Sequence, residues 1–321
     1  MIATVTLNPS LDEWIELPTL RIGALHRGQG FRRYPGGKGI NVSRVIHELG
    51  ARTCAYALAG GQDGVILRQL LDAEGVPCEF LTVQGATRNN YKILTRMPRA
   101  LTEINGAGPR ITATALAGLQ RRVWRLHPGV VTLCGSLPPG VPATTYGRWI
   151  AALRRRQIAV VLDTSGDALR HGVAARPWLI KPNQREAEEL LGRPLTGLRS
   201  AVRASMELSQ RGIPWVLLSR GREGALLACA DPPAVWQAVP PNVAARSAVG
   251  AGDSLVAGWL VGWLRGGTPQ SRGRGWEHRA AEALRLGVAC GTATALTPGT
   301  ELCHRRDIHR LRRRVRIERL V

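Results

Sequence analysis

The feature that most constrains this fold is the regular alternation of short apolar runs with longer segments of helical periodicity. The apolar runs have the length of buried strands and lie at residues 2–7, 53–58, 130–133, 159–162, 178–180 and 215–218. The segments between them predict helices at residues 41–49, 64–74, 144–155, 184–191 and 198–211. Strands that alternate with helices in this way predict an α/β protein whose mostly parallel sheet is covered by helices on both faces.

Three regions depart from this alternation. Residues 12–34 and 87–105 contain short alternating strands with turns, and we expect them to pair into a small sheet outside the main one. The C-terminal third contains two longer helical windows at residues 252–264 and 277–296. A chain of 321 residues that is 44% hydrophobic and has no internal repeat predicts one large domain spanning residues 1–321.

The composition excludes several classes of protein. No window approaches the roughly 18 apolar residues of a membrane span, and residues 1–7 resemble a strand rather than a signal peptide. Six cysteines are scattered without a Cys-x-x-Cys pair, which argues against a zinc site or a disulfide framework. We therefore expect a cytoplasmic protein with no membrane partner.

The net charge of +21 raises the alternative of a nucleic-acid-binding protein. The charge is spread along the chain, with its densest patch at residues 304–319, and no motif interleaves basic with aromatic residues. We predict that this patch is a solvated helix and that nucleic acid is not the partner. A basic surface also suits an enzyme that binds anionic substrates.

Residues 247–264 carry the strongest functional signal. Gly250 and Gly252 stand at the expected start of an apolar helix, where bare backbone N–H groups form an anion site. Asp253 lies in the first turn, where the helix dipole favours an ionised carboxylate. Phosphoryl transfer needs a carboxylate that accepts a hydroxyl proton beside N–H donors that stabilise developing charge. The alternative is an N-capped core helix in which the glycines serve packing.

Lysine is rare in this chain. Of 44 lysines and arginines, only Lys38, Lys92 and Lys181 are lysines. Lysine is a compact, mobile charge that can bind phosphate at close range. Lys38 lies in a glycine-rich segment before a helix, where glycines admit a ligand to the backbone and Asn41 can pair with sugar hydroxyls. A glycine turn with Asn41 as a helix cap is the alternative.

Lys181 opens a second segment that enters a helix. Asn183 and Glu186 share one face of that helix, and oxygen ligands beside a phosphate-binding lysine would suit Mg²⁺. The same pair fits a capping box equally well. Open α/β sheets bind ligands beyond the carboxyl ends of their strands. Both lysine segments belong to that edge, and so do the polar or glycine-rich loops that follow predicted strands, at residues 8–12, 135–140, 163–166 and 219–221. The sequence therefore predicts one site at that edge of the sheet.

Taken together, these segments resemble the ribokinase-like sugar kinases, in particular the phosphofructokinase B-type branch. The resemblance spans nearly the whole chain. It rests on TLNPSLD (6–12), PGGKGINVSRV (35–45), TRNNYKI (87–93), TEINGAGPRI (102–111), GSLPPGV (135–141), LDTSG (162–166), KPNQRE (181–186), SRGREGAL (219–226) and VGAGDSLVAG (249–258). It implies a three-layer αβα ribokinase-like domain with a small β-lid, formed by about residues 12–34 and 87–105. In such kinases the lid usually supplies a homodimer interface.

The resemblance also implies ATP and Mg²⁺ as cofactors and a role for individual residues. Asp253 matches the base that deprotonates the sugar hydroxyl, and the backbone of Ala251, Gly252 and Asp253, preceded by Gly250, matches the anion hole. Lys181, Asn183 and Glu186 match groups that bind nucleotide phosphates and magnesium, and Ser219, Gly221 and Gly224 match the nucleotide site. The sugar-binding set matches Asp12, Gly36, Gly37, Lys38 and Asn41. Contacts to the phosphate that the substrate already carries match Arg88, Arg27 and Ser136.

The substrate expected from this resemblance is fructose 1-phosphate. Gly-Gly-Lys-Gly and residues 102–109 look most like the 1-phosphofructokinase subgroup. Fructose 6-phosphate and tagatose 6-phosphate stay open, because residues 299–303 are reminiscent of the 6-phosphofructokinase type. A kinase for an unphosphorylated sugar would leave Arg88 and Lys38 facing no phosphate.

The remote alternative is a nucleic-acid-binding protein on an inactive kinase scaffold. Arg220, in a segment that is often Ser-Leu-Gly, bears on nucleotide preference.

Overall fold

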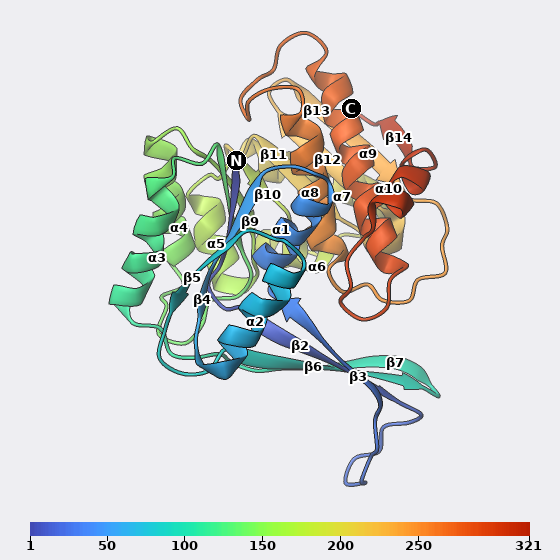
Figure 1. The fold of residues 1–321 in the computed structure, drawn as a ribbon. Helices are drawn as coiled ribbons and strands as arrows, with labels where there is room; N and C mark the ends of the chain where they lie inside the picture. The colour runs from blue at the N-terminus through green and yellow to red at the C-terminus, as the bar shows by residue number, and fades with distance from the viewer.

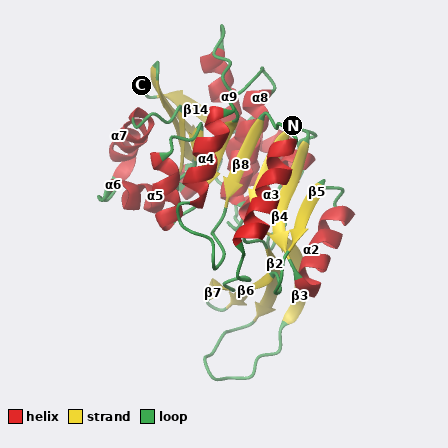
Figure 2. Ribbon diagram, turned by 90° about the vertical axis from the view of Figure 1, so that its left-hand side faces the viewer, coloured by secondary structure: helices red, strands yellow, loops and turns green.

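The computed structural model describes residues 1–321, and its centre is a ten-stranded sheet (Figures 1 and 2). The strand order is β14-β13-β12-β11-β10-β9-β8-β1-β4-β5. The strands are β1 (Ile2–Thr6), β4 (Thr53–Ala59), β5 (Cys78–Thr82), β8 (Val130–Cys134), β9 (Ala159–Asp163), β10 (Leu179–Ile180), β11 (Trp215–Ser219), β12 (Ala225–Ala230), β13 (Pro233–Val239) and β14 (Arg316–Arg319). All neighbours from β11 to β5 are parallel, whereas β12, β13 and β14 add an antiparallel edge.

Helices cover both faces of this sheet, which is why its parallel strands are continuously apolar. One face carries α1 (Lys38–Glu48), α2 (Gly61–Ala73), α8 (Ala251–Leu264), α9 (Trp276–Ala295) and α10 (Arg305–Arg312). The other face carries α3 (Ala113–Arg125), α4 (Thr145–Arg155), α5 (Gly166–Ala174), α6 (Gln184–Leu191) and α7 (Gly197–Gln210). The prediction of a three-layer α/β fold with a mostly parallel sheet is confirmed.

A second sheet of four strands projects from the carboxyl edge of the main sheet (Figure 2). Its order is β3 (Gln29–Gly36), β2 (Ser10–Leu17), β6 (Arg88–Arg96) and β7 (Arg99–Asn105), and we call it the lid sheet. β2 pairs parallel with β6, and the other pairs are antiparallel. Because successive side chains on a strand point to opposite faces, Asp12, Asn90 and Lys92 share one face of the lid sheet. Tyr91 and Ile104 share the other.

Helix α8 is apolar on almost every side, because it is buried between the main sheet and α9. Trp259 and Trp263 of α8 pack against Trp215 of β11, with ring centroids 5.7 and 5.0 Å apart. Both contacts are edge-on, an arrangement that aromatic pairs favour. This packing fixes the carboxyl half of α8 against the main sheet.

The C-terminal patch departs from its prediction as one solvated helix over residues 304–319. Only α10 is helical, and it packs against α9 with Ile308 and Leu311 buried. Residues Arg316–Arg319 instead form β14, which pairs antiparallel with β13 and places Ile317 opposite Ala238. The edge of β13 offers unpaired backbone N–H and C=O groups. Pairing with them stabilises this short charged segment as a strand more than a helix would. The single-helix prediction is therefore wrong for this strand.

The helices of this fold are too short or too polar to cross a lipid bilayer.

Candidate active site

The carboxyl ends of the parallel strands meet at the edge of the main sheet from which the lid sheet projects (Figure 2). Asp163 ends β9, Lys181 follows β10 directly, and Ser219 ends β11. Parallel pairing of β9, β10 and β11 brings these residues to one edge because their strands run in the same direction. The amino end of α8 reaches the same edge, since a Cβ atom placed on Gly252 would lie 3.5 Å from the Lys181 Nζ atom.

The first turn of α8 offers unpaired backbone donors. Gly250 caps the helix with φ of 79°, a left-handed conformation that glycine adopts at little cost. A Cβ atom at this position would lie 2.6 Å from the Leu302 Cδ2 atom, so the site also requires glycine for space. The amides of Gly252 and Asp253 have no hydrogen-bond acceptor within the protein. Two free N–H groups at a helix amino end form an anion-binding cradle.

Asp253 is buried beside this cradle. Its Oδ2 atom accepts a hydrogen bond of 2.8 Å from the Asn41 Nδ2 atom of α1. Burial raises the pKa of Asp253 to about 6, the nearby Asp163 carboxylate adds to the rise, and Lys38, Asn41 and Lys181 oppose it. A carboxylate with a pKa near 6 is ionised at neutral pH and yet basic enough to accept a proton during reaction.

Two of the three lysines meet on one carboxylate. Asp163 is fully buried, and its Oδ1 atom lies 2.8 Å from the Lys38 Nζ atom and 3.4 Å from the Lys181 Nζ atom. Burial alone would raise the pKa of Asp163, but the charges of Lys181 and Lys38 outweigh it and hold that pKa below its usual value. The sequence places the corner at residues 163–166 at this site but assigns no role to the Asp163 side chain.

Asn183 and Glu186 form the capping box of α6. The Asn183 Oδ1 atom accepts from the Glu186 amide at 2.8 Å, and the Glu186 Oε2 atom accepts from the Asn183 amide at 2.8 Å. The other Glu186 oxygen takes no part in this box, and the buried Asp163 Oδ2 atom has no hydrogen-bond partner. No group of three carboxylate, histidine or cysteine side chains that could enclose a metal ion is present. This donor set fits Mg²⁺, which binds through one or two carboxylates and fills its remaining positions with phosphates and waters.

A tight turn after β11 carries the residues predicted for the nucleotide. Gly221 begins the short 3₁₀ helix η1 (Gly221–Glu223) with φ of 56°, and no atom lies near the position of a Cβ. Gly224 has φ of 86°, and a Cβ there would collide with the Ala238 carbonyl oxygen of β13. Arg220 is buried and pairs with Glu223. The turn therefore exposes backbone beside Ser219.

Asp12 is buried where the lid sheet meets the main sheet. Its Oδ1 atom accepts hydrogen bonds from the Ser10 Oγ atom at 3.0 Å and the Asn90 Nδ2 atom at 3.2 Å. Gly36 lies opposite Ser10 on β3, and a Cβ on it would approach the Asp12 carboxylate to 2.4 Å. Gly37, with φ of 116°, leads directly into Lys38 at the start of α1. Asp12, Gly36, Gly37, Lys38 and Asn41 thus lie along one continuous path from the lid sheet to Asp253.

Arg88 joins the lid sheet to the loop after β1. Its guanidinium donates to the Gly106 carbonyl at 2.9 Å and to the Asn8 carbonyl at 3.0 Å, and it has no carboxylate partner. Burial lowers the pKa of Arg88, and the Asp12 charge opposes that shift. Ser136 lies close by, since its Oγ atom accepts from the Asn8 Nδ2 atom at 3.3 Å. By contrast, Arg27 is exposed, and the loop between β2 and β3 to which it belongs extends away from the main body (Figure 1), so the structure does not bring it to the other candidates.

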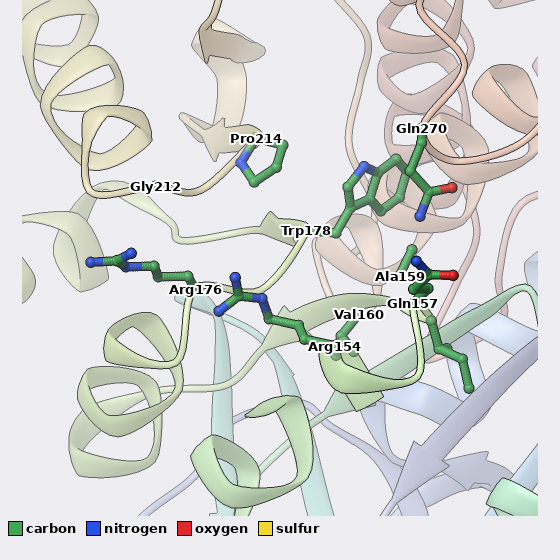
Figure 3. A pocket seen from close by; sticks show the side chains of 10 residues that line it. Arg154, Gln157, Ala159, Val160, Arg176, Trp178, Gly212, Pro214 and Gln270 are labelled. Atoms are coloured by element: carbon green, nitrogen blue, oxygen red, sulfur yellow. The ribbon is translucent and has the colours of Figure 1, made fainter. Parts of the chain in front are cut away.

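A surface hollow of about 540 Å³ lies at the other end of the parallel strands (Figure 3). Ala159, Trp178 and Pro214 mark the amino ends of β9, β10 and β11 there, and Arg154 and Arg176 contribute their side chains. No carboxylate lines this hollow, so it offers neither a proton acceptor nor an anionic metal ligand. The candidate active site therefore remains at the carboxyl edge.

Comparisons with known proteins agree with this geometry. The model of the pfkB family of carbohydrate kinases matches residues 6–306. A 1-phosphofructokinase of Bacillus subtilis is 37% identical over 304 residues, which cover 94% of this chain and 95% of that protein. An ATP-dependent 6-phosphofructokinase isozyme 2 of Mycobacterium tuberculosis is 35% identical over 96% of this chain and 88% of that protein.

The fold also matches solved structures. The crystal structure of phosphofructokinase-2 from Escherichia coli in complex with substrates and products superposes with a TM-score of 0.90. It is 32% identical, and the match covers 98% of each chain. That protein has also been solved in a tetrameric inhibited form. Because the family model and these relatives extend over most of the chain, the protein belongs to the pfkB family of carbohydrate kinases, sugar kinases that use ATP.

Proposed function

We propose that this kinase transfers the γ-phosphoryl group of ATP to fructose 1-phosphate and releases fructose 1,6-bisphosphate and ADP. The observation that carries the proposal is the buried Asp253 carboxylate beside the unpaired amides of α8. The Lys38 and Lys181 ammonium groups on Asp163 lie next to it. The similarity to the 1-phosphofructokinase of Bacillus subtilis supports the choice of substrate.

Asp253 acts as the base in this reaction. It accepts the proton of the sugar hydroxyl as that oxygen bonds to the γ-phosphorus atom, and the bond from the γ-phosphorus to the bridging oxygen of ADP breaks. The Gly252 and Asp253 amides, on the backbone that begins with Gly250 and Ala251, donate to the oxygens of the transferred group. Lys181 and Lys38 offset the negative charge that develops there.

Mg²⁺ would be held by the free oxygen of Glu186 and the unpaired Oδ2 atom of Asp163, with Asn183 keeping Glu186 oriented. When bound, the ion supplies charge neutralisation on the nucleotide phosphates. The capping box has a second effect, because it fixes the Glu186 side chain whether or not the ion is present. Ser219, Gly221 and Gly224 would contact the nucleotide.

The sugar phosphate would lie between the lid sheet and α8. Asp12, Gly36, Gly37, Lys38 and Asn41 would bind the sugar. Arg88 and Ser136, next to Asn8, would bind the phosphate that the substrate carries. Arg27 would contact this phosphate only if its loop moved towards the site or if a neighbouring subunit supplied the residue.

Fructose 6-phosphate is the second candidate substrate. The observation that favours it is the similarity to the 6-phosphofructokinase isozyme 2 of Mycobacterium tuberculosis and to the phosphofructokinase-2 structure. Tagatose 6-phosphate, a ketohexose phosphate as well, would meet the same Arg88.

The substrate is tested by measuring ADP release from Mg-ATP with purified protein. The panel is fructose 1-phosphate, fructose 6-phosphate, tagatose 6-phosphate, free fructose and ribose. We expect the highest kcat/KM with fructose 1-phosphate. A higher value with either 6-phosphate would replace that assignment, and turnover of free sugars alone would remove the role of Arg88. No turnover at all would favour the inactive-scaffold alternative.

The Asp253→Asn variant is the matched control for this panel. We expect kcat to fall by about 10²–10⁴-fold, because the amide cannot accept the hydroxyl proton. Binding of ATP, measured by titration calorimetry, should be retained. Turnover close to that of the unaltered protein would contradict the assignment of Asp253 as the base.

We further infer a homodimer formed through the outer face of the lid sheet. Phe31, Tyr91 and Ile104 are exposed on strands β3, β6 and β7 of that sheet. Exposed apolar side chains gathered on one sheet face are typical of protein–protein contacts.

A further inference from the structure

Lys92 is the one lysine that the proposed mechanism does not use. It lies on β6, on the face of the lid sheet that carries Asp12 and Asn90. Its residue is only 4% exposed, although lysine is among the residue types least often buried. Burial of an ammonium group is costly unless oxygen atoms surround it, so the position calls for acceptors.

Two carboxylates of the protein lie near the Lys92 ammonium, but neither is close enough to accept a hydrogen bond from it. The Lys92 Nζ atom lies 3.8 Å from the Asp12 Oδ2 atom and 3.7 Å from the Glu103 Oε2 atom. Both distances give charge attraction, but neither is within hydrogen-bond range. The Asp12 Oδ1 atom is already engaged by Ser10 and Asn90, which leaves Oδ2 as the carboxylate oxygen directed to Lys92.

The 3.8 Å gap has the dimensions of one bridging hydroxyl. An oxygen about 2.8 Å from both the Nζ and Oδ2 atoms fits there, because hydrogen bonds of that length to each atom close a triangle over the gap. A hydroxyl is also the group that suits the gap chemically, since its oxygen accepts from the ammonium and its proton is donated to the carboxylate.

We propose that Lys92 and Asp12 together bind one ring hydroxyl of the sugar, and that Lys92 is a specificity-determining residue of this kinase. The proposal rests on the proposed function only in placing a ketohexose phosphate at Asp12. Glu103 faces Lys92 from β7 and orients the ammonium towards the gap.

Lysine suits this role better than arginine would. The ammonium is compact and directs three donors from one atom, so it can hold two carboxylates and a hydroxyl at once. The larger planar guanidinium requires room that a residue 4% exposed does not have. This requirement gives a physical reason for a lysine at residue 92 in a chain in which nearly all other long cations are arginines.

Lys92 also affects the ionisation of its partner. Burial raises the pKa of Asp12, and the Lys92 charge opposes that rise. Glu103 adds to the rise in the pKa of Asp12, Arg88 of β6 interacts with the Asp12 charge, and Tyr34 lies opposite on β3. Removal of the Lys92 charge should therefore leave more Asp12 protonated at a given pH, and binding of a hydroxyl donor should weaken first at acidic pH.

The test compares Lys92→Met, which keeps the length of the side chain without its charge, with Lys92→Arg, which keeps the charge. Arg96→Met is the matched control, because Arg96 is exposed at the end of the same strand and pairs only with Glu16. Steady-state kinetics are measured with fructose 1-phosphate and its C3 and C4 epimers, psicose 1-phosphate and tagatose 1-phosphate, across the acidic pH range.

We expect Lys92→Met to raise KM for the sugar phosphate about 10- to 100-fold, with little change in kcat or in KM for ATP. Its preference between epimers should shrink, and the acid limb of kcat/KM should move to higher pH. Lys92→Arg should keep the limb in place but still raise KM. Arg96→Met should behave like the unaltered protein, which separates these effects from a general loss of lid structure.

Unchanged KM, epimer preference and acid limb in Lys92→Met would overturn the proposal. Failure of the proposed substrate gives a different result, namely no turnover of any ketose phosphate by the unaltered protein. In that event the same variants are compared on whichever sugar of the panel is phosphorylated, against an epimer that differs at one hydroxyl. An equal KM for that sugar in Lys92→Met and the unaltered protein would again overturn the role of Lys92.

Discussion

At the scale of single residues, the candidate site is a set of buried charges that modify one another. Asp163 neutralises two lysines while its own charge raises the pKa of Asp253. Asn41 orients the Asp253 carboxylate by a direct hydrogen bond. The proton affinity of the proposed base is therefore set by neighbours from α1 and β9 as well as by burial.

This arrangement predicts a specific pH dependence. The pKa of Asp253 is raised to about 6, so kcat/KM for the sugar should fall as the pH decreases through about 6, where the base becomes protonated. Asp163→Asn removes a negative charge that raises this pKa, so the acid limb should move to lower pH. Initial rates between pH 5 and 8 measure the acid limb of the unaltered protein and that of Asp163→Asn. A limb that stays in place or moves upward in Asp163→Asn would contradict the coupling.

The sequence alone predicts some of these residues and not others. It found Asp253, Lys38 and Lys181 because a glycine-flanked acid and rare lysines stand out along the chain. It placed residues 163–166 at the site but gave Asp163 no role, because that role comes from the meeting of two lysines that lie 125 and 18 residues away. It also left two interpretations of Asn183 and Glu186, and the capping box is present alongside a free carboxylate oxygen.

At the scale of elements, the amino end of α8 is the part that tolerates least change. Its cap, Gly250, combines a left-handed backbone with a close approach to Leu302. The helix behind it is fixed by tryptophan packing, so the first turn cannot move away from a larger side chain without displacing Asp253.

Gly250→Ala should therefore destabilise the protein by about 2–4 kcal/mol, from the left-handed conformation together with the overlap with Leu302. It should also lower kcat, because the first turn carries Asp253, the proposed base. Gly192→Ala is the matched control, since Gly192 also has positive φ, 67°, but no atom lies near its Cβ position. We expect that variant to lose only about 1–2 kcal/mol in urea unfolding. Equal losses in both variants would show that the Leu302 contact has no effect.

The sequence predicts the central parallel strands of the main sheet best, whereas the buried strand β12 has no counterpart among the predicted strands. The parallel strands β1, β8 and β9 are evident from the sequence as apolar runs, because helices cover both faces of the sheet at these strands. β14 was missed because an edge strand of arginine, isoleucine and glutamate has no apolar signal. Its place depends on the free edge of β13, about 80 residues earlier in the chain.

At the scale of the whole molecule, the lid sheet has one face directed to the site and one directed outward (Figure 1). The inward face carries the polar residues Asp12, Asn90 and Lys92. The outward face exposes Phe31 and Ile104. Such a division suits a sheet that binds substrate on one side and a second subunit on the other.

If the outward face forms the dimer, Ile104→Glu should give a monomer, because a charged side chain would be buried without a partner at the interface. Sedimentation velocity should then show the 34.7 kDa chain rather than twice that mass. Leu126→Glu is the control, since Leu126 is comparably exposed but lies outside the lid sheet. A monomeric unaltered protein, or a dimer that survives Ile104→Glu, would place the interface elsewhere or remove it.

The division of the site between two sheets has a consequence for which acceptor is phosphorylated. Asp253 and the α8 amides belong to the main body. Asp12 and Lys92 belong to the lid sheet, which joins the body at the β1–β2, β3–α1, β5–β6 and β7–α3 connections. In the proposed function a sugar phosphate would engage both parts at once. A water molecule could occupy only the position beside Asp253, so it would gain none of the binding free energy that the lid sheet supplies. Under this proposal the division of the site discriminates by size against ATP hydrolysis.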